Sequence, residues 1–367
     1  MYATGTMLRQ SAALAADIEG LTGPVASRVG EALATVPGEA LRRVVLVGSG
    51  DSHHAGRAAQ LAFLRLTGLP CEALGTQQFL DYGMLGPAGP AGPHAATLVV
   101  AVSASGSSPR LVTTVRRARA HGFPTLAVTG RAGSALGEAA GREVAATLGL
   151  TERSPGIRTY QASLLALLLL AVRLGGVRHA LPGGGPAAED ALVAEIAATA
   201  DAVRATADAA DGPCRELAAR LTEAGRPWAP LVFAGTGPAG GTAMYAAAKV
   251  VEAAGLPAYA QDLEEYWHIE RFADPADAPL VVLAPPGLGH PRAAELAAAA
   301  TGRGRRVIAV TGPDDTALTG TAWHTVPVTG TAREEWSPLT GHVFAGLLGA
   351  RLADRLDRTP FSGGGPD

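Results

Sequence analysis

The chain has 367 residues, 47% of them apolar and 17% charged, which is enough material for buried sheets and helices in about two domains. Its net charge of −3 gives no reason to expect a nucleic acid or a membrane as a partner. The two cysteines, Cys71 and Cys214, cannot form a disulfide framework and match no metal-ligand spacing. We therefore expect a cytoplasmic protein with neither metal nor cofactor.

Short apolar runs alternate with Ala-rich helical stretches along the chain. This pattern favours an α/β fold of three layers, in which a parallel sheet has helices on both faces. The most apolar run, ASLLALLLLAV at 162–172, is too short to cross a bilayer and predicts a buried helix. The predicted strands are residues 44–47, 98–102, 125–128, 231–234, 280–283 and 307–310.

Composition divides the chain into four segments. Residues 1–40 form an N-terminal helical segment, and residues 41–180 form a first α/β domain. Residues 181–212 start with the linker-like LPGGGPAAED and continue as a helix. Residues 213–367 form a second α/β domain, whose final TPFSGGGPD has a flexible composition although its first residues can still pack.

An internal repeat relates the two predicted domains. RRVVLVGSG ends at Gly50 and PLVFAGTG ends at Gly237, so the offset is 237 − 50 = 187 residues. The same offset aligns GLPCEALGTQQF from Gly68 with GLPAYAQDLEEY from Gly255. A third pair, HGFPTLAVTG and GRRVIAVTG, has an offset of 312 − 130 = 182, and five extra residues in LGPAGPAGPHAA would explain the slip. Three matches in the same order indicate a duplicated domain.

A polar loop, SASGSSP, follows the second predicted strand and leads into a helix. Hydroxyls beside the free N–H groups and the positive end of a helix make a neutral cradle for a phosphate dianion. Ser52, after the neighbouring strand, supports this interpretation because ligands gather at the carboxyl ends of parallel strands. The alternative is a polar turn whose serine only caps the helix. The loop residues in question are Ser103, Ser105, Gly106, Ser107 and Ser108.

GSGDSHHAG, SASGSSP and the repeat resemble the sugar isomerase (SIS) domain family over roughly residues 43–357. The tandem form is similar to the isomerase half of glucosamine-6-phosphate synthase and to related sugar-phosphate deglycases and isomerases. The resemblance implies two tandem SIS domains. It also implies that Ser52 and the serine loop bind the phosphate of a phosphorylated sugar or amino sugar. The other binding residues that it implies are Gly50, Asp51, Arg158 and Glu265.

In the second half, AAAKVVE resembles the family helix whose glutamate moves the proton between C1 and C2. The resemblance implies that Glu252 is the catalytic base and that Lys249 is the family lysine. The family spacing of sixteen residues from this glutamate places the ring-opening histidine at His268, and a matching glutamate is Glu265. In the family this histidine reaches the active site of the neighbouring subunit, which implies a homodimer with shared active sites.

Lys249 is the only lysine in the chain. It stands three residues before Glu252, so both side chains face the same side of a helix. A compact ammonium can donate to an oxyanion and hold a carboxylate ionised, whereas a guanidinium is bulkier and fixes its donors in a fork. The alternatives are an ordinary surface ion pair for Lys249 and Glu252, and a packed core residue for His268.

Several positions depart from the family pattern. Asp51 replaces a residue that is typically threonine, and it could pair with an arginine or with a substrate amino group. Arg158 stands where the synthases carry lysine, and APPGLGHPR replaces the serine loop in the second half, so that half should not bind phosphate. Phe361 and Ser362 stand in the tail where the synthases carry an active-site lysine.

We therefore expect a phosphosugar-acting enzyme, either an aldose–ketose isomerase or an amino-sugar-phosphate deaminase or deglycase. One alternative is a non-catalytic sugar-phosphate-binding regulator, although a regulator needs only the phosphate loops and has no use for Lys249, Glu252 and His268. The other is an ammonia-dependent hexosamine-phosphate synthase served by a separate glutaminase.

Overall fold

The computed structural model describes residues 3–85, 94–149, 152–223, 229–273, 275 and 277–362. The chain forms two compact units, each assembled from separate segments. The first-sheet unit comprises Ala16–Leu150 and Arg158–Ala198. The second-sheet unit comprises Met1–Ala15, Thr151–Ile157 and Thr199–Asp367. The four contiguous segments expected from the sequence remain a prediction about domains.

The first-sheet unit contains a five-stranded parallel sheet in the order β2-β1-β3-β4-β5. Apolar residues of β1, β3 and β4 are buried on both sides, as expected for a sheet with helices on both faces. The strands are β1 Arg43–Gly48, β2 Cys71–Gly75, β3 Thr97–Ser103, β4 Thr125–Thr129 and β5 Glu143–Ala145.

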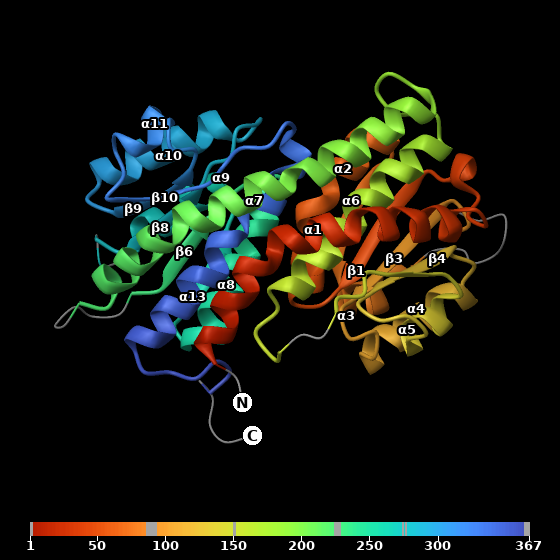
Figure 1. The fold of residues 1–367 in the computed structure, drawn as a ribbon, viewed down its shortest axis with the longest axis horizontal. Helices are drawn as coiled ribbons and strands as arrows, with labels where there is room; N and C mark the ends of the chain where they lie inside the picture. Colours follow the sequence, from red (N-terminus) through yellow and green to blue (C-terminus); the bar gives the residue numbers. More distant parts are fainter. Residues whose placement is uncertain are drawn as a thin grey trace. The chain divides into compact units, whose positions relative to one another are not determined.

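Helices cover both faces of this sheet (Figure 1). On one face, α4 and α5 pack against alternate strand residues such as Val45, Val99 and Ala127. On the other face, α2 packs against β1 and β3 and against α6. The helical segments are α2 Asp51–Thr67, α3 Thr76–Gln78, the π-helical η2 Phe79–Gly83, α4 Pro109–Ala120, α5 Ala135–Ala140 and α6 Arg158–Val177.

Helix α6 contains the long apolar run, which is buried as predicted. The helix has 20 residues, so by length and composition alone it could cross a membrane. The apolar run at 162–172, which the sequence analysis found too short to cross a bilayer, forms only part of this helix. Its most apolar window is 83% buried inside the protein, as in the core helix of a globular fold.

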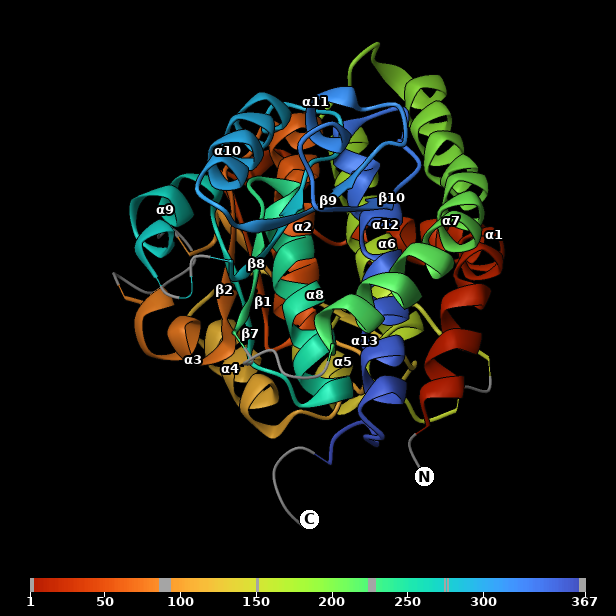
Figure 2. The same cartoon turned by 90° about the vertical axis from the view of Figure 1, so that its left-hand side faces the viewer.

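The second-sheet unit repeats this architecture, with the strand order β7-β6-β8-β9-β10. Figure 2 shows α10 and α11 on one side of β8 to β10 and α8 and α13 on the other. The strands are β6 Leu231–Ala234, β7 Ala258–Gln261, β8 Pro279–Leu283, β9 Arg306–Thr311 and β10 His324–Pro327. The helical segments are α8 Pro238–Ala254, α9 Leu263–His268, η3 Glu270–Phe272, α10 His290–Gly302, α11 Thr316–Thr319, η4 Glu334–Trp336, α12 Ser337–Gly341 and α13 Val343–Arg355.

Three further helical segments complete the described chain: α1 Thr4–Leu33, η1 Gly38–Ala40 and α7 Gly185–Leu221. The linker expected at LPGGGPAAED is shorter than its composition suggests, because α7 already begins at Gly185. Only residues 181–184 of that stretch precede the helix, with a turn at residues 182 and 183. Pro186 is compatible with this start, since the first turn of a helix needs no N–H donor from proline.

The repeat is visible in the backbone of the two sheets' first helices. Both α2 and α8 have 17 residues, and each follows a glycine of nearly the same conformation. Gly50 has φ 53° and ψ −131°, and Gly237 has φ 55° and ψ −133°. Both helices end at a left-handed glycine, Gly68 or Gly255. The offset of 187 residues therefore pairs equivalent positions, whereas the loop assigned to the five-residue slip lies largely outside the described residues.

Candidate functional site

The serine loop connects β3 to α4 at the carboxyl edge of the first sheet. Ser103 is buried at the end of β3, and its Oγ accepts a hydrogen bond of 3.2 Å from the N–H of Gly106. Ser107 donates from its N–H and its hydroxyl to Ser105 Oγ, at 3.3 and 3.2 Å. Ser105 and Ser107 are exposed, and Ser108 is half-buried. The loop thus presents hydroxyls beside the N-terminus of a 12-residue helix, as an anion site requires.

Gly106 can only be glycine here. Its φ is +63°, and a Cβ would overlap the side chain of Ser134. Ser134 is held in turn by the carboxylate of Glu143, which accepts bonds of 2.6 Å from Ser134 Oγ and 2.8 Å from Thr129 Oγ1. Glu143 therefore supports the serine loop through Ser134, which lies against Gly106. Sequence reasoning missed Glu143.

The second polar loop of this unit follows β1. Because β1 and β3 are adjacent and parallel, Ser52 and Ser103 follow strands that end at the same edge of the sheet. Gly50 has the left-handed φ described above, and Asp51 begins α2, where the positive helix end stabilises a carboxylate. Asp51 Oδ1 lies 3.7 Å from His54 Nδ1. The sequence analysis considered an arginine or a substrate amino group as the partner of Asp51. The contact with His54 supports neither of them.

Two groups near Asp51, the His53 imidazole and the Tyr160 hydroxyl, have pKa values shifted from the usual ones. Burial lowers the pKa of His53, and the charges of His54 and Arg57 lower it further, although a hydrogen bond with the backbone of Ala73 opposes them. Burial raises the pKa of Tyr160 well above its usual range, and the Asp51 carboxylate adds to this effect. Near neutral pH the His53 imidazole is therefore uncharged, and it adds no positive charge to the loop.

Arg158, a predicted binding residue, forms a structural ion pair within the first-sheet unit. Its Nε and Nη2 donate to the two carboxylate oxygens of Asp17, at 2.6 and 2.5 Å. This hydrogen bonding raises the pKa of Arg158 above its ordinary value. Bidentate pairing with a buried carboxylate fixes the guanidinium, so contact with a substrate would have to use its remaining donors.

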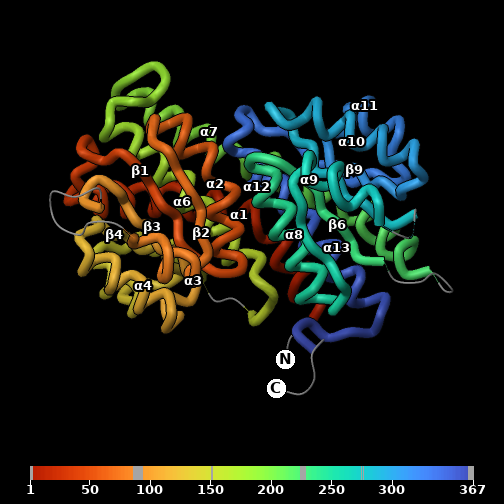
Figure 3. Tube along the Cα trace, turned by 180° about the vertical axis from the view of Figure 1, so that it is seen from behind, coloured from red at the N-terminus to blue at the C-terminus, as the bar shows by residue number. Residues whose placement is uncertain are grey.

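Lys249 and Glu252 lie near the C-terminal end of α8, in the second-sheet unit. The Lys249 side chain is fully buried, while Glu252 is 29% exposed, and Lys249 Nζ makes a short contact with Glu252 Oε2. Helix α13 runs beside α8 (Figure 3). A Cβ at Gly349 of α13 would stand 3.0 Å from the backbone oxygen of Lys249. The close helix packing explains the burial.

This burial bears on both readings of the pair. An ordinary surface ion pair is wrong for Lys249, because no part of its side chain meets solvent. A substrate that enters from solvent also cannot reach the ammonium in this conformation, so Lys249 cannot donate directly to a substrate oxygen. Holding the partly exposed Glu252 carboxylate ionised needs no such path. The geometry therefore favours the second of the two roles expected for the ammonium.

Glu265 and His268 lie on the short helix α9 of the same unit, and both are exposed. His268 Nε2 lies 3.1 Å from Glu264 Oε1, and its side chain is 63% exposed. A packed core residue is therefore the wrong interpretation of His268. An exposed imidazole is available to a partner, as the expected role requires, but that role stays a prediction.

The C-terminal tail contacts the end of α8. The N–H of Phe361 donates to the backbone oxygen of Glu252 at 2.7 Å, and the Arg358 guanidinium donates to the backbone oxygen of Ala254. The first tail residues therefore pack, whereas residues 363–367 lie outside the described residues. One backbone N–H and one guanidinium of the tail thus satisfy carbonyls at the C-terminus of the helix that carries Glu252.

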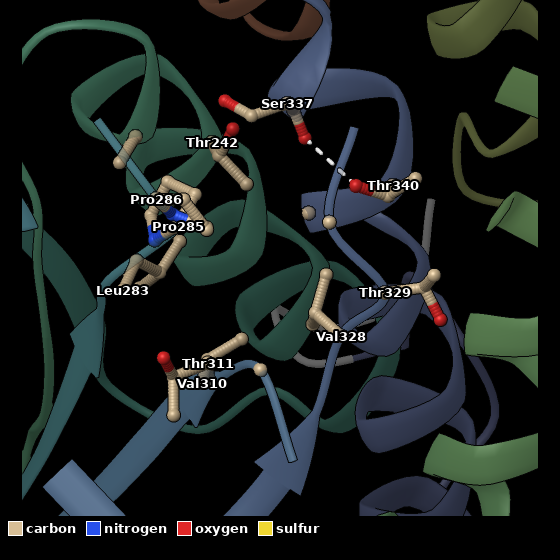
Figure 4. Close-up of a pocket in the computed structure, with 14 residues that line it drawn as sticks. Thr242, Leu283, Pro285, Pro286, Val310, Thr311, Val328, Thr329, Ser337 and Thr340 are labelled. Atoms are coloured by element: carbon tan, nitrogen blue, oxygen red, sulfur yellow. Dashed lines mark hydrogen bonds between the residues drawn. The ribbon is translucent and has the colours of Figure 1, made fainter. Parts of the chain in front are cut away.

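The second sheet has a pocket at its own carboxyl edge, of about 420 Å³ with open solvent included (Figure 4). Leu283, Pro285, Val310 and Val328 line it with apolar groups. Thr340 Oγ1 donates to the backbone oxygen of Ser337 at 3.2 Å, so this hydroxyl is already engaged. Prolines lack N–H donors, and no Lys or Arg occurs among the described lining residues. These features agree with the expectation that this half does not bind phosphate, which remains a prediction.

A polar pair lies beside this pocket. His290 Nε2 lies 2.7 Å from Asp315 Oδ2, to which Thr311 Oγ1 also donates at 2.6 Å. Burial opposes ionisation of Asp315, but the bonds from Thr311 and His290 together outweigh it and lower its pKa. Sequence reasoning missed this pair. Among the described residues, no three His, Cys, Asp or Glu side chains meet as a metal site would require.

Comparisons with known proteins agree with the resemblance. Residues 40–173 match the model of the SIS domain. The chain is similar to glutamine–fructose-6-phosphate aminotransferase (isomerizing) of Gloeobacter violaceus, at 27% identity over 86% of this chain and 49% of that protein. It is 30% identical to the enzyme of that name from Pseudomonas syringae pv. tomato, over 67% of this chain and 38% of that protein. The chain thus spans about half or less of these relatives.

Solved structures show the same fold. The C-terminal domain of glucosamine-fructose-6-phosphate aminotransferase from Francisella tularensis matches with a TM-score of 0.81 at 14% identity, covering 97% of both chains. Tagatose-6-phosphate ketose/aldose isomerase from Escherichia coli matches with a TM-score of 0.66 at 18% identity, covering 98% of this chain and 93% of that one. Residues 40–173 are therefore a SIS domain, and the second sheet repeats the strand order of the first.

Proposed function

We propose that the protein is an enzyme acting on a phosphorylated sugar or amino sugar, with Glu252 as the group that transfers a proton between C1 and C2. The observation that carries the proposal is the Lys249–Glu252 pair, in which a fully buried ammonium faces a partly exposed carboxylate. Burying a charge is costly unless it is paired. A chain that otherwise uses arginine for its basic residues retains lysine at this one position.

The proposed step is an enolisation. The Glu252 carboxylate removes the proton on the carbon next to the carbonyl, and the electron pair shifts onto the carbonyl oxygen to form an enediolate. A proton then moves between the oxygens on C1 and C2, and Glu252 returns its proton to the former carbonyl carbon. Lys249 keeps the carboxylate ionised and oriented. His268 would open the sugar ring by proton transfer to the ring oxygen, and the serine loop with Ser52 would hold the phosphate.

This step serves both aldose–ketose isomerisation and the loss or gain of an amine at C1 or C2. The enzymes named among the relatives include an aminotransferase and a ketose/aldose isomerase, which supports the shared step without choosing between the outcomes. The proposal includes a homodimer in which His268 serves the neighbouring subunit. Mixed dimers of Glu252→Gln and His268→Ala subunits should then recover some activity, and verified mixed dimers without any activity would exclude the sharing.

The test is proton exchange on a panel of 6-phosphosugars, with and without an amino group, in deuterated water. Enolisation should place deuterium at C1 or C2 of the accepted substrate, which proton NMR detects whichever product forms. Added ammonia distinguishes an ammonia-dependent synthase. Binding of a phosphosugar with no exchange on any member, with or without ammonia, would overturn the enzyme proposal in favour of a regulator.

A further inference from the structure

Tyr245 stands one helical turn before Lys249 on α8. Residues four apart on a helix lie on the same face. The Tyr245 ring is fully buried, and Lys249 Nζ lies 5.0 Å from its centroid. This distance falls within the range at which a cation is attracted to the face of an aromatic ring.

The ring is held in place from two further sides. Its hydroxyl donates to the backbone oxygen of Gly156 at 2.9 Å. The His342 ring, between α12 and α13, meets the Tyr245 ring edge to face, with centroids 5.5 Å apart and planes at 89°. The hydroxyl is thus engaged by the backbone of residues 152–157, which belong to the same unit, and the ring has little freedom to turn.

We propose that Tyr245 is a positioning residue, which holds the Lys249 ammonium by a cation–π contact and, through it, the Glu252 carboxylate. The inference rests on the proposed function. Once buried, the ammonium has lost water, and the ring face returns part of the stabilisation that hydration gave. The fixed ring and the carboxylate of Glu252 both contact the ammonium, and together they restrict the position of its Nζ.

The repeat supplies an internal reference. The position equivalent to Tyr245 is 245 − 187 = 58, which is Ala58 on α2, and the position equivalent to Lys249 is Ala62. Helix α2 therefore has the same length and caps without either the ring or the ammonium. The frame of the fold does not require Tyr245, and the ring occurs where the lysine does.

The first test varies the ring without changing its shape. Tyr245→Phe removes only the hydroxyl, and phenylalanines with one, two and three ring fluorines at position 245 then weaken the negative face stepwise. We expect kcat to stay within about threefold for Tyr245→Phe and to fall progressively, to on the order of tenfold at three fluorines, or about 1.4 kcal/mol. KM should change little. The same fluorination at Phe233, a buried ring of β6, is the matched control.

A purely structural role predicts a flat series, because fluorination barely changes volume. A flat series, or a decline that follows the unfolding temperature and also occurs at Phe233, would overturn the inference. Only a decline specific to position 245 in a stably folded protein supports it.

The second test uses no substrate, so it separates failure of this inference from failure of the proposed function. Because Lys249 is the only lysine, labelling with ¹³C-lysine gives the NMR signals of one side chain. The ring current of Tyr245 should displace the Cε signals, Tyr245→Phe should preserve this displacement, and Tyr245→Leu should abolish it in a folded protein. Equal shifts in the wild type and Tyr245→Leu would overturn the contact whatever the protein catalyses.

Discussion

The two halves of this chain share a frame and differ in chemistry. Their sheets have one strand order, and α2 and α8 agree in length, in both caps and in the conformation of the preceding glycine. Yet the serine loop of the first half corresponds, at the offset of 182, to Pro285 and the residues after it. Conversely, Lys249 and Glu252 on α8 correspond to Ala62 and Arg65 on α2.

Under the proposed function, the two halves would contribute different chemical groups to one reaction. Anion binding needs N–H donors and hydroxyls at a helix start, and the first half provides them where the second has prolines and apolar groups. Proton transfer needs an ionised carboxylate in a protected place, and only the second half buries an ammonium beside one. Equivalent positions are therefore natural controls for each other.

The largest expected effect on turnover follows from replacing Glu252, the proposed proton-transfer group. Glu252→Gln should lower turnover by on the order of 10²- to 10⁴-fold, because an amide cannot accept the proton. Arg65→Gln, the same position of the repeat on α2, also removes one charge and should leave turnover within about twofold. Steady-state kinetics on the accepted phosphosugar measures both.

Glu252→Gln also leaves the buried ammonium without its counter-charge, which can cost stability. Glu252→Asp is therefore a necessary companion, because it keeps the charge and withdraws the carboxylate by one methylene. The Glu252→Asp variant should fold and still show a lower turnover than the wild type. Wild-type turnover in either Glu252 variant would contradict the assignment.

The next largest effect concerns the serine loop. Changing Ser103 and Ser105 together to alanine should lower phosphosugar affinity by about 100-fold or more, since each charge-assisted hydrogen bond is worth about 1.5–3 kcal/mol. Thr329→Ala, in the pocket of the second sheet, removes a hydroxyl from the other half and should leave affinity unchanged. Calorimetric titration measures both affinities.

Ser103 Oγ also accepts the Gly106 N–H, so the double variant can disturb the loop itself. Ser105→Ala alone avoids that bond and should give a smaller loss of the same sign. If the folded double variant binds as tightly as the wild type, the phosphate lies elsewhere. If Thr329→Ala lowers phosphosugar affinity as much as the double variant does, the proposal that only the first half binds phosphate is wrong.

The fold could be predicted from sequence at the centre of each sheet and not at its edges. All six predicted strands are confirmed, and each differs from the observed strand by at most one residue at either end. The four strands not predicted, β2, β5, β7 and β10, are the edge strands of the two sheets. An edge strand such as Ala258–Gln261 is only half-buried, so it lacks the continuous apolar run that identifies a central strand.

The candidate site, too, could be predicted from the sequence only in part. Local signals identified the serine loop and the Lys249–Glu252 pair, because a loop composition and an i,i+3 spacing can be recognised without the fold. Glu143 could not be found, since it reaches Ser134 and Thr129 only after β4 and β5 pair. Tyr245 could have been found, because it precedes the lysine by one turn, but its burial against Gly156 and His342 depends on tertiary packing.

The smallest expected difference between the halves is in their response to acid. His53, in the first turn of α2, corresponds to position 53 + 187 = 240, which is Gly240 on α8 and does not titrate. Burial, with the charges of His54 and Arg57, lowers the folded-state pKa of His53 below 6.5. Between that lowered pKa and 6.5, the unfolded chain binds more protons at this position than the folded protein does.

Stability must therefore rise with pH across this window and be lost as the pH falls from 6.5 towards the lowered pKa. His53→Gln removes the titrating group and keeps a side chain that can hydrogen-bond, so its stability should depend less on pH. Because His53 is only partly buried, solvent screening limits the difference to about a fraction of a kcal/mol. Urea unfolding of both proteins at pH 7.5 and 5.5 measures it, and the shift in midpoint between the two pH values should be larger for the wild type. A shift of equal size in the variant would mean that the acid sensitivity of the first half arises from other groups, and that the frames of the two halves do not differ in this respect.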